Sequence, residues 1–198
     1  GTKRKGGGPP EEILVVVEGK TDDPWLLAKK AAVGVSRFPP RRGGGGALIL
    51  GAAHARGKFL FLLNADFMVP PQAIGTVISA FEGKPQLDAL FGSYDDEPSE
   101  PNFLSQYRNL LHHYVHQHGR EEASTFWGAC GAIRRDVFLS IGGFDERYAR
   151  PSIEDIELGY RLKKAGSRIR LCKTLQVKHL KRWNLGSMLQ ADIFQRAL

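Results

Sequence analysis

The sequence predicts an α/β fold, a three-layer sandwich with helices on both faces of a mostly parallel central sheet. Two observations lead to this prediction. Short apolar runs, typical of buried strands, alternate along the chain with longer segments of helical spacing. The chain has 198 residues, 42% of them hydrophobic, which suffices for one domain with an ordinary core.

The expected strands are runs too short for helices and rich in β-branched or aromatic residues. The clearest is Phe59-Leu60-Phe61-Leu62-Leu63, which is continuous in apolar residues and ends at Asn64-Ala65-Asp66. A strand covered on both faces has this pattern. The remaining expected strands are 13–17, 33–38, 87–94, 169–172 and 175–177, with 126–133 as strand or loop.

Helices are expected where a capping residue or a proline precedes a segment of helical spacing. The expected helices are 22–32, 47–55, 70–81, 102–118, 136–141 and 152–165. The last of these has acids in its first turn, Lys163 and Lys164 in its last turn, and Gly166 after it. That arrangement complements the helix dipole and provides a glycine terminator.

Three segments are expected along the chain: a flexible leader at 1–10, a domain at 11–182 and an amphipathic basic tail at 183–198. The net charge of +7 is unevenly placed, because residues 161–198 hold ten Lys or Arg and one acid. A basic segment suits phosphate-bearing partners, such as a diphosphate donor, an anionic membrane surface or nucleic acid. A solvated basic face is the alternative.

Composition also indicates the compartment. No apolar run approaches the ~20 residues of a membrane span, and no signal peptide is visible at the start. The two cysteines, Cys130 and Cys172, do not form a disulfide framework and indicate reduced thiols. We therefore expect a cytoplasmic protein.

Two acidic clusters, about ninety residues apart, carry the functional argument. One carboxylate, Asp66, follows a buried strand, and the neutral Asn64 stands two residues before it. A single carboxylate would leave most coordination positions of Mg²⁺ or Mn²⁺ open to phosphate oxygens of the substrate. Asp155 is placed to act as a general base, with Glu154 orienting an acceptor. An Asx turn at Asp66, and dipole complementation at Glu154 and Asp155, are the structural alternatives.

The order of six motifs resembles the family 2 glycosyltransferases of the GT-A fold, from about residue 11 to the end. The motifs are Glu18-Gly19-Lys20-Thr21-Asp22, Asn64-Ala65-Asp66, Trp127-Gly128-Ala129-Cys130-Gly131-Ala132, Gly142-Gly143-Phe144-Asp145-Glu146, Glu154-Asp155 and His179-Leu180-Lys181-Arg182-Trp183. The resemblance implies a GT-A-type, Rossmann-like sandwich. It also implies inverting transfer of a sugar from a nucleotide-diphosphate donor.

The resemblance further implies roles for individual residues. Asp155 matches the family's catalytic base, with Glu154 beside it. The metal is assigned to Asp66 and His179, and the acceptor and sugar pocket to Trp127, Gly128 and Gly131. The donor-binding residues implied are Glu18, Asp22, Asn64, Asp66, Arg182 and Trp183.

The sequence departs from the family pattern mainly in its first part. Nothing matches the usual opening strand that ends in Pro-x-Tyr-Asn. Val17 stands where the family has an Asp, Leu48-Ile49 where Arg-Asn is common, and Asn64 replaces the first Asp of Asp-x-Asp. We therefore expect an N-terminally truncated domain that lacks the family's first strand-helix unit.

The leading prediction is a glycosyltransferase of cell-envelope glycan synthesis. Its acceptor would be a glycan or lipid-linked, and it would be membrane-associated through its tail at the inner face. A degenerate GT-A domain acting as a scaffold is one alternative. A nucleotidylyltransferase is another, although the Glu-Asp helix argues against it. We expect no nucleic-acid partner, because no recognised binding motif accompanies the basic tail.

Four histidines, His112, His113, His116 and His118, lie close together in the expected helix at 102–118. His112 and His116 have metal-compatible spacing, but no nearby cysteine completes a ligand set. They predict a surface or acceptor-facing helix rather than a metal site.

Overall fold

The computed structural model describes residues 12–18, 34–38, 44–148 and 153–194, together with Pro10, Leu26 and Lys30. The expected leader, apart from Pro10, lies outside the described residues. So does most of the expected helix at 22–32, including Asp22.

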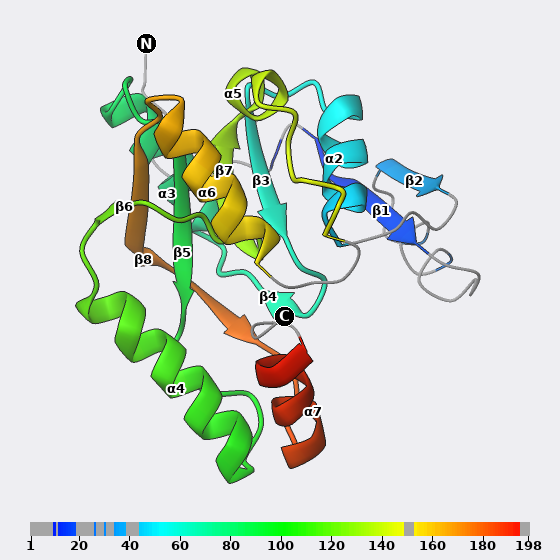
Figure 1. The fold of residues 1–198 in the computed structure, drawn as a ribbon, viewed down its shortest axis with the longest axis vertical. Helices are drawn as coiled ribbons and strands as arrows, with labels where there is room; N and C mark the ends of the chain where they lie inside the picture. Colours follow the sequence, from blue (N-terminus) through cyan, green and yellow to red (C-terminus); the bar gives the residue numbers. More distant parts are fainter. Residues whose placement is uncertain are drawn as a thin grey trace.

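A six-stranded sheet forms the centre of the molecule (Figure 1). Its strands are β3 (Phe59–Leu63), β7 (Cys130–Arg134), β5 (Ala89–Tyr94), β8 (Ile169–His179) and β4 (Phe67–Met68) in spatial order, and β6 (Glu122–Ala123), which pairs with β8. A second, two-stranded sheet pairs β1 (Leu14–Glu18) and β2 (Gly34–Phe38) in parallel.

The α/β architecture is as predicted, but the pairing within the main sheet is mixed rather than mostly parallel. Strands β3, β5 and β8 point the same way, and β7 lies antiparallel between β3 and β5. Of the described pairs in this sheet, only β5 with β8 is parallel. An apolar run buried on both faces looks the same whichever way its neighbours point, so the sequence pattern did not reveal the direction of β7.

Helices cover both faces of the sheet (Figure 1). The described helices are α2 (Gly44–His54), α3 (Ala73–Gly83), α4 (Phe103–His118), α5 (Arg135–Ser140), α6 (Glu154–Lys164), α7 (Leu185–Leu189) and a π-helical turn at Gln190–Phe194. One core cluster packs Phe138 of α5 and Leu158 of α6 against the sheet. The other packs Val77 and Phe81 of α3 against the sheet. These layers give the predicted sandwich.

Among the element boundaries that differ from expectation, two have a clear structural cause. Helix α2 begins at Gly44 rather than Ala47, within a glycine run expected to be a loop. A Cβ at Gly45 would lie 2.6 Å from the Cβ of Phe144, so the missing side chain allows the helix to approach that ring. Strand β8 is a single strand of 11 residues where two short strands were expected. The pairing of β8 with β5 shifts in register between Phe91 and Ser93, and this shift accommodates the irregular middle of β8.

Both cysteines are free thiols. Cys130 is buried in β7, and its burial raises the thiol pKa to about 12. Cys172, in β8, is only partly buried. Among the described residues, no helix has the length and apolar character that a bilayer crossing requires.

Candidate active site

Asp66 and His179 meet at the edge of the sheet. Asp66 lies in the turn between β3 and β4, and His179 is the last residue of β8. The antiparallel pairing of β4 with β8 sets Phe67 opposite His179. His179 Nε2 then lies 3.2 Å from Asp66 Oδ2. The imidazole is buried, whereas the carboxylate is partly open to solvent.

The carboxyl of Asp66 is held in its charged form. Its hydrogen bond with His179 lowers its pKa below the usual value, and the charges of His179 and Lys181 act in the same direction. Burial opposes this effect without overcoming it. Asp66 therefore presents an ionised oxygen ligand next to an imidazole nitrogen.

Asp155 lies in the first turn of α6. Its Oδ1 accepts a hydrogen bond of 2.8 Å from the N–H of Ile156. Burial, followed by the charge of Glu154, nevertheless raises its pKa to about 6. A carboxyl with this pKa is ionised at neutral pH but still attracts a proton, as a general base must.

A short loop at 127–129 contacts the segments that carry both acids. The N–H of Asn64 donates to the carbonyl of Ala129 over 3.1 Å, and Gly128 packs against Asp155. A Cβ at Gly128 would lie 2.9 Å from Phe144 Cζ and 3.8 Å from the Cβ of Asp155. A side chain at position 128 would therefore collide with the ring of Phe144, so a glycine lets the loop lie between that ring and Asp155.

An aromatic stack supports His179 from behind. Tyr94 stacks on His179 with ring centroids 4.8 Å apart, and on His112 with centroids 4.0 Å apart. Trp127 packs against Tyr94 at 5.2 Å and against His112 at 4.6 Å. Phe67 meets His179 edge-on at 5.1 Å. These contacts restrict the His179 ring to one orientation.

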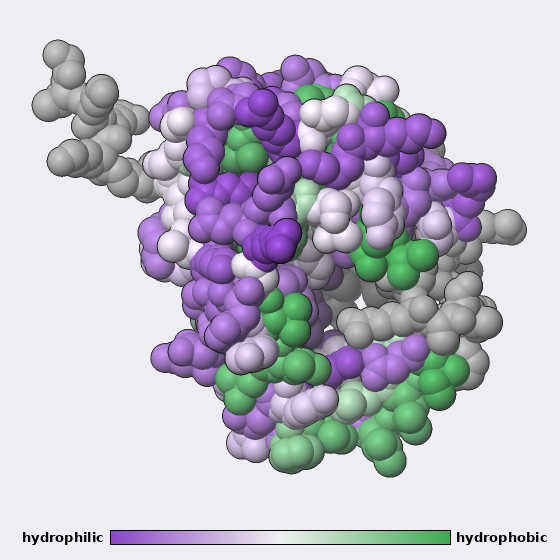
Figure 2. All heavy atoms as spheres, turned by 60° about the vertical axis from the view of Figure 1, so that its left-hand side comes forward, coloured by the Kyte–Doolittle hydropathy of each residue, from purple (hydrophilic) through white to green (hydrophobic). Residues whose placement is uncertain are grey.

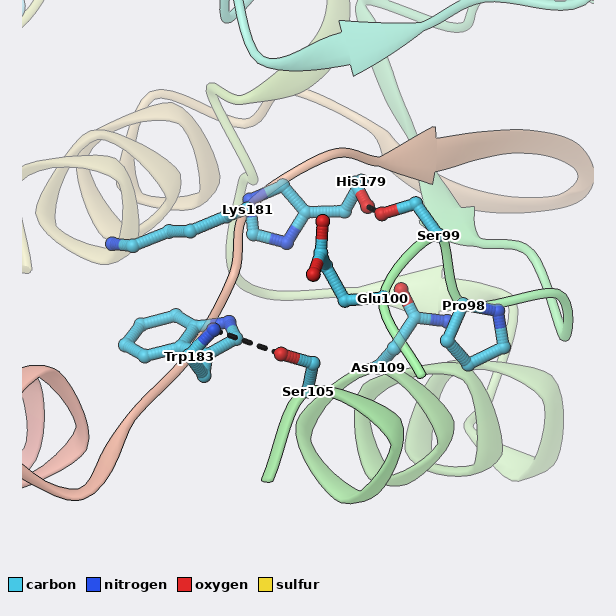
Figure 3. A pocket seen from close by; sticks show the side chains of 8 residues that line it. All are labelled: Pro98, Ser99, Glu100, Ser105, Asn109, His179, Lys181 and Trp183. Carbon is cyan, nitrogen blue, oxygen red and sulfur yellow. Dashed lines mark hydrogen bonds between the residues drawn. The ribbon is translucent and has the colours of Figure 1, made fainter. Parts of the chain in front are cut away.

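The segment after β8 forms a small recess beside His179 (Figure 3). Its lining residues are Pro98, Ser99, Glu100, Ser105, Asn109, His179, Lys181 and Trp183. Two hydrogen bonds fix the recess: Ser99 Oγ donates to the His179 carbonyl over 2.7 Å, and the Trp183 N–H donates to Ser105 Oγ over 2.8 Å. The backbone following His179 is thereby tied to the start of α4.

The predicted donor residues of this segment already have partners. Cations lie over the ring of Trp183, with Lys181 Nζ at 4.0 Å and Arg108 Cζ at 4.9 Å from its centroid. Arg182 is exposed and lies 3.8 Å from Glu100. Stacking of a sugar or base on Trp183 would therefore require one of these cations to move.

Glu18 and Gly131 are not among the residues that line this recess. Glu18 ends β1, paired with Phe38, and Asp22 lies outside the described residues. Gly131 lies within β7, opposite Leu62. A side chain there would collide with the ring of Phe126, so core packing accounts for this glycine.

Three of the four α4 histidines face the protein. His112 and His116 pack against Trp127, and His113 Nδ1 lies 2.8 Å from the Tyr94 carbonyl. Burial lowers the pKa of His116 to about 4. His118 is exposed and the other three are partly buried, so α4 is a surface helix as expected, but most of its histidines lie on its inner side. Whether they face an acceptor stays a prediction. No group of three or more His, Cys, Asp or Glu suited to a metal occurs within the described part of the chain.

Sequence reasoning missed several residues that shape the site, notably Tyr94, Ser99 and Ser105. Ser105 and Asn109 are polar residues at helical spacing on a helix whose apolar residues lie elsewhere. That polar stripe was the available signal. Tyr94 gave none, because its partners come from segments distant in the sequence.

Solved structures share this fold. The chain is similar to the mannosyltransferase PcManGT from Pyrobaculum calidifontis, solved with GDP-Man and Mn²⁺. The TM-score is 0.64 at 18% identity, over 93% of this chain and 52% of that one. It is also similar to GalNAc-T7, solved with UDP, GalNAc and Mn²⁺, with a TM-score of 0.62 at 17% identity over 87% and 38%. A mycobacterial protein gives 0.61 at 19% identity over 90% and 59%. The fold is that of the GT-A glycosyltransferases.

The chain belongs to glycosyl transferase family 2, whose model matches residues 3–142. A second model, described as the N-terminal domain of galactosyltransferase, matches residues 108–183. Among curated proteins, a 39-residue stretch is 54% identical to an N-acetylglucosaminyl-diphospho-decaprenol L-rhamnosyltransferase of two Mycobacterium tuberculosis strains. That stretch covers 20% of this chain and 12% of the relative.

Proposed function

We propose that this glycosyltransferase moves a sugar from a nucleoside-diphosphate donor to an acceptor hydroxyl, with inversion at the anomeric carbon. The observation that carries the proposal is the loop at 127–129, which contacts both acidic segments. Through Ala129 it accepts a hydrogen bond from Asn64, in the turn of Asp66, and through Gly128 it packs against Asp155. A donor-side carboxylate and an acceptor-side base thus share one rigid support.

Asp155 acts on the acceptor. Its raised pKa, about 6, lets it accept the hydroxyl proton as the oxygen attacks the anomeric carbon. The bond from that carbon to the diphosphate oxygen breaks in the same step, and its electrons leave with the nucleoside diphosphate. Glu154, beside Asp155, orients the acceptor. A single displacement of this kind inverts the anomeric centre.

Asp66 and His179 fit a divalent cation, Mg²⁺ or Mn²⁺. One ionised oxygen and one imidazole nitrogen, 3.2 Å apart, would form a sparse ligand set once a cation replaced the proton between them, and this set would leave positions for phosphate oxygens. A cation bound there would offset the charge of the departing diphosphate. Lys181, whose charge already acts on Asp66, adds a further positive group on the leaving-group side.

A lipid-linked acceptor is the second part of the proposal. The M. tuberculosis relative is named for a diphospho-decaprenol acceptor, which supports an acceptor of this chemical class. The basic tail at 183–198 would accompany such an acceptor at the cytoplasmic face of a membrane. The rhamnosyl donor in that name is not carried over, because only 39 residues match.

The first test is calorimetric titration with UDP, GDP and dTDP, each with Mn²⁺, with Mg²⁺ and with EDTA. We expect one nucleotide to bind in a metal-dependent way, which would narrow the donor class. Asp66→Ala should abolish the metal dependence, whereas Asp136→Asn, which removes an exposed carboxylate from α5, should not. Equal affinity in metal and in EDTA would refute the metal assignment.

The second test is product analysis with the corresponding nucleotide sugar and a short polyprenyl-diphosphate-sugar acceptor. NMR of the product should show the anomeric configuration opposite to that of the donor. Retention of configuration would overturn the single displacement at Asp155.

A further inference from the structure

Helix α4 is amphipathic, but its polar side faces the protein and its apolar side faces solvent. Its polar residues Ser105 and Asn109 are only 3% and 4% exposed, whereas Phe103 is 76% exposed. The exposed apolar residues recur at helical spacing along its outer face: Phe103, Tyr107, Leu110, Leu111, Tyr114 and Val115. A surface helix of a globular protein normally packs its apolar stripe against the hydrophobic core.

Hydrogen bonds explain why the polar stripe faces inward. Asn109 Nδ2 donates to the carbonyl of Asp95 over 2.8 Å, and Gln117 Nε2 donates to that of Lys173 over 3.1 Å. Ser105 accepts from Trp183. These bonds satisfy backbone groups at the end of β5 and in the middle of β8. The apolar stripe consequently has no place in the core.

The chain after β8 extends the same apolar surface. Leu185, Leu189 and Ile193 are all exposed. The ion pair of 2.8 Å between Arg108 and Asp192 joins this segment to α4. Figure 2 shows hydrophobic residues gathered along the lower end of the molecule, where Figure 1 places α4 and α7. We call the exposed apolar residues of 103–115 and 185–193 the α4–α7 face.

The two segments that carry the α4–α7 face have a small net positive charge. Residues 99–120 and 180–194 contain four cations, Arg108, Arg120, Lys181 and Arg182, against two acids, Glu100 and Asp192. Both acids pair with cations of the same set. The exposed cations lie near both ends of α4, with Arg120 after its last turn and Arg182 beside Glu100, before its first.

We propose that the α4–α7 face docks on the surface of an anionic lipid bilayer. Aliphatic and aromatic side chains on one helical face enter the headgroup region, and cations at its margins meet lipid phosphates. A second copy of the chain fits less well. A two-fold contact would bring the same cations of both copies to one interface, with no unpaired acid within these segments to meet them.

Docking through this face gives the site an orientation. The recess beside His179 is lined by Ser105 and Asn109 of α4 and by Trp183, from the same two segments that carry the α4–α7 face. A bilayer against those segments would present a membrane-embedded acceptor close to the recess. That link rests on the proposed function, whereas the docking itself does not.

Vesicle flotation tests the docking without donor or acceptor. The chain is mixed with vesicles of phosphatidylcholine alone, or with about 30 mol% phosphatidylglycerol added as the anionic lipid. We expect flotation mainly with the anionic vesicles, reduced by raised salt. Phe103→Ser/Leu111→Ser should lower the partition coefficient about tenfold or more, because two apolar anchors are lost.

The matched control is Ile78→Ser/Leu139→Ser, which removes two exposed apolar side chains from α3 and α5. It should float like the unaltered chain, and circular dichroism should show all three proteins folded.

No flotation of the unaltered chain, or equal flotation of both double variants, would overturn the proposal. So would a lipid-free dimer in sedimentation equilibrium that Phe103→Ser/Leu111→Ser dissociates, since the face would then belong to a second copy. Metal-dependent nucleotide binding without flotation would leave the proposed function standing and remove only the docking.

Discussion

His179 Nε2 lies 3.2 Å from Asp66 Oδ2, although 113 residues separate the two in the chain. The short antiparallel ladder between β4 and β8 brings them together, and the Leu180 N–H closes it by donating to the Asp66 carbonyl over 2.9 Å. Two residues of β4 thus set the position of Asp66 relative to His179. Tyr94, stacked on the face of the imidazole, restricts the movement of that ring.

Asp66→Asn should weaken metal-dependent nucleotide binding by about tenfold or more, because the amide keeps the shape of the side chain but loses the ionised oxygen. Calorimetry with Mn²⁺ measures the change. Asp136→Asn removes the same charge from an exposed position and should leave binding unchanged. If Asp66→Asn bound nucleotide and Mn²⁺ as tightly as the unaltered chain, the ligand would lie elsewhere.

Asp155→Asn should reduce kcat by about 10³ while donor affinity stays the same, since the amide cannot accept the acceptor proton. Steady-state assays and calorimetry separate the two quantities. Glu157→Gln is the matched control, because it removes a carboxylate from the same turn of α6. Glu157 holds Arg161 through bonds of 2.6 and 2.8 Å, so turnover should survive its loss. Equal losses in both variants would point to damage of the helix rather than to a base.

The pH profile of kcat/KM should fall on the acid side with a midpoint near 6. Below that pH Asp155 is protonated, because burial has raised its pKa to about 6. The same shift affects stability in the opposite direction. A carboxyl whose folded pKa is raised contributes stability fully below its unfolded pKa, and loses it as pH rises through the folded value.

Asp155→Asn, which never ionises, should therefore unfold in urea at the same or a higher concentration than the unaltered chain at pH 7. At pH 4 this advantage should disappear. An acid limb near pH 4 in the unaltered enzyme would show that the pKa of Asp155 is not raised, and would contradict its assignment as the base.

Gly159→Ala should destabilise the fold by about 2 kcal/mol, because an added Cβ would overlap backbone atoms of Thr125 and Phe126. Gly83→Ala is the control within α3, where a Cβ meets nothing within 4 Å. It should stabilise the protein by about 0.5 kcal/mol, since alanine restricts the unfolded chain. Urea unfolding compares the two. Equal and small effects would mean that α6 can shift away from the 125–126 backbone at little cost.

Local patterns predicted the elements better than their arrangement. Phe59–Leu63 was predicted to the residue, because a continuous apolar run has few other solutions. The direction of β7 and the single strand β8 depend on pairing between distant segments, which periodicity does not encode. The start of α2 was missed because a glycine run reads as a loop unless the ring of Phe144 is known to lie against it.

For the candidate site too, the sequence identified residues but not the contacts between them. The resemblance to the family named Asp66, His179 and Asp155. The structure places Asp66 against His179, and both acidic segments against the loop at 127–129. The resemblance could not show that Lys181 lies over the ring of Trp183, or that Tyr94 stacks on the imidazole of His179. The inward polar face of α4 was missed because the usual assumption places apolar residues inside. The roles of Glu18 and Asp22 remain predictions.

The different exposure of the two thiols allows local unfolding of the sheet to be measured by cysteine labelling. Cys130, with a pKa raised to about 12, is closed to reagents in the folded state, whereas Cys172 is partly accessible. A maleimide should therefore add one label quickly and a second only when β7 leaves the sheet. The rate of the second addition measures how often the centre of the molecule opens. Because β7 follows directly on the loop at 127–129, that rate would also report whether nucleotide binding at the site tightens the core beneath it.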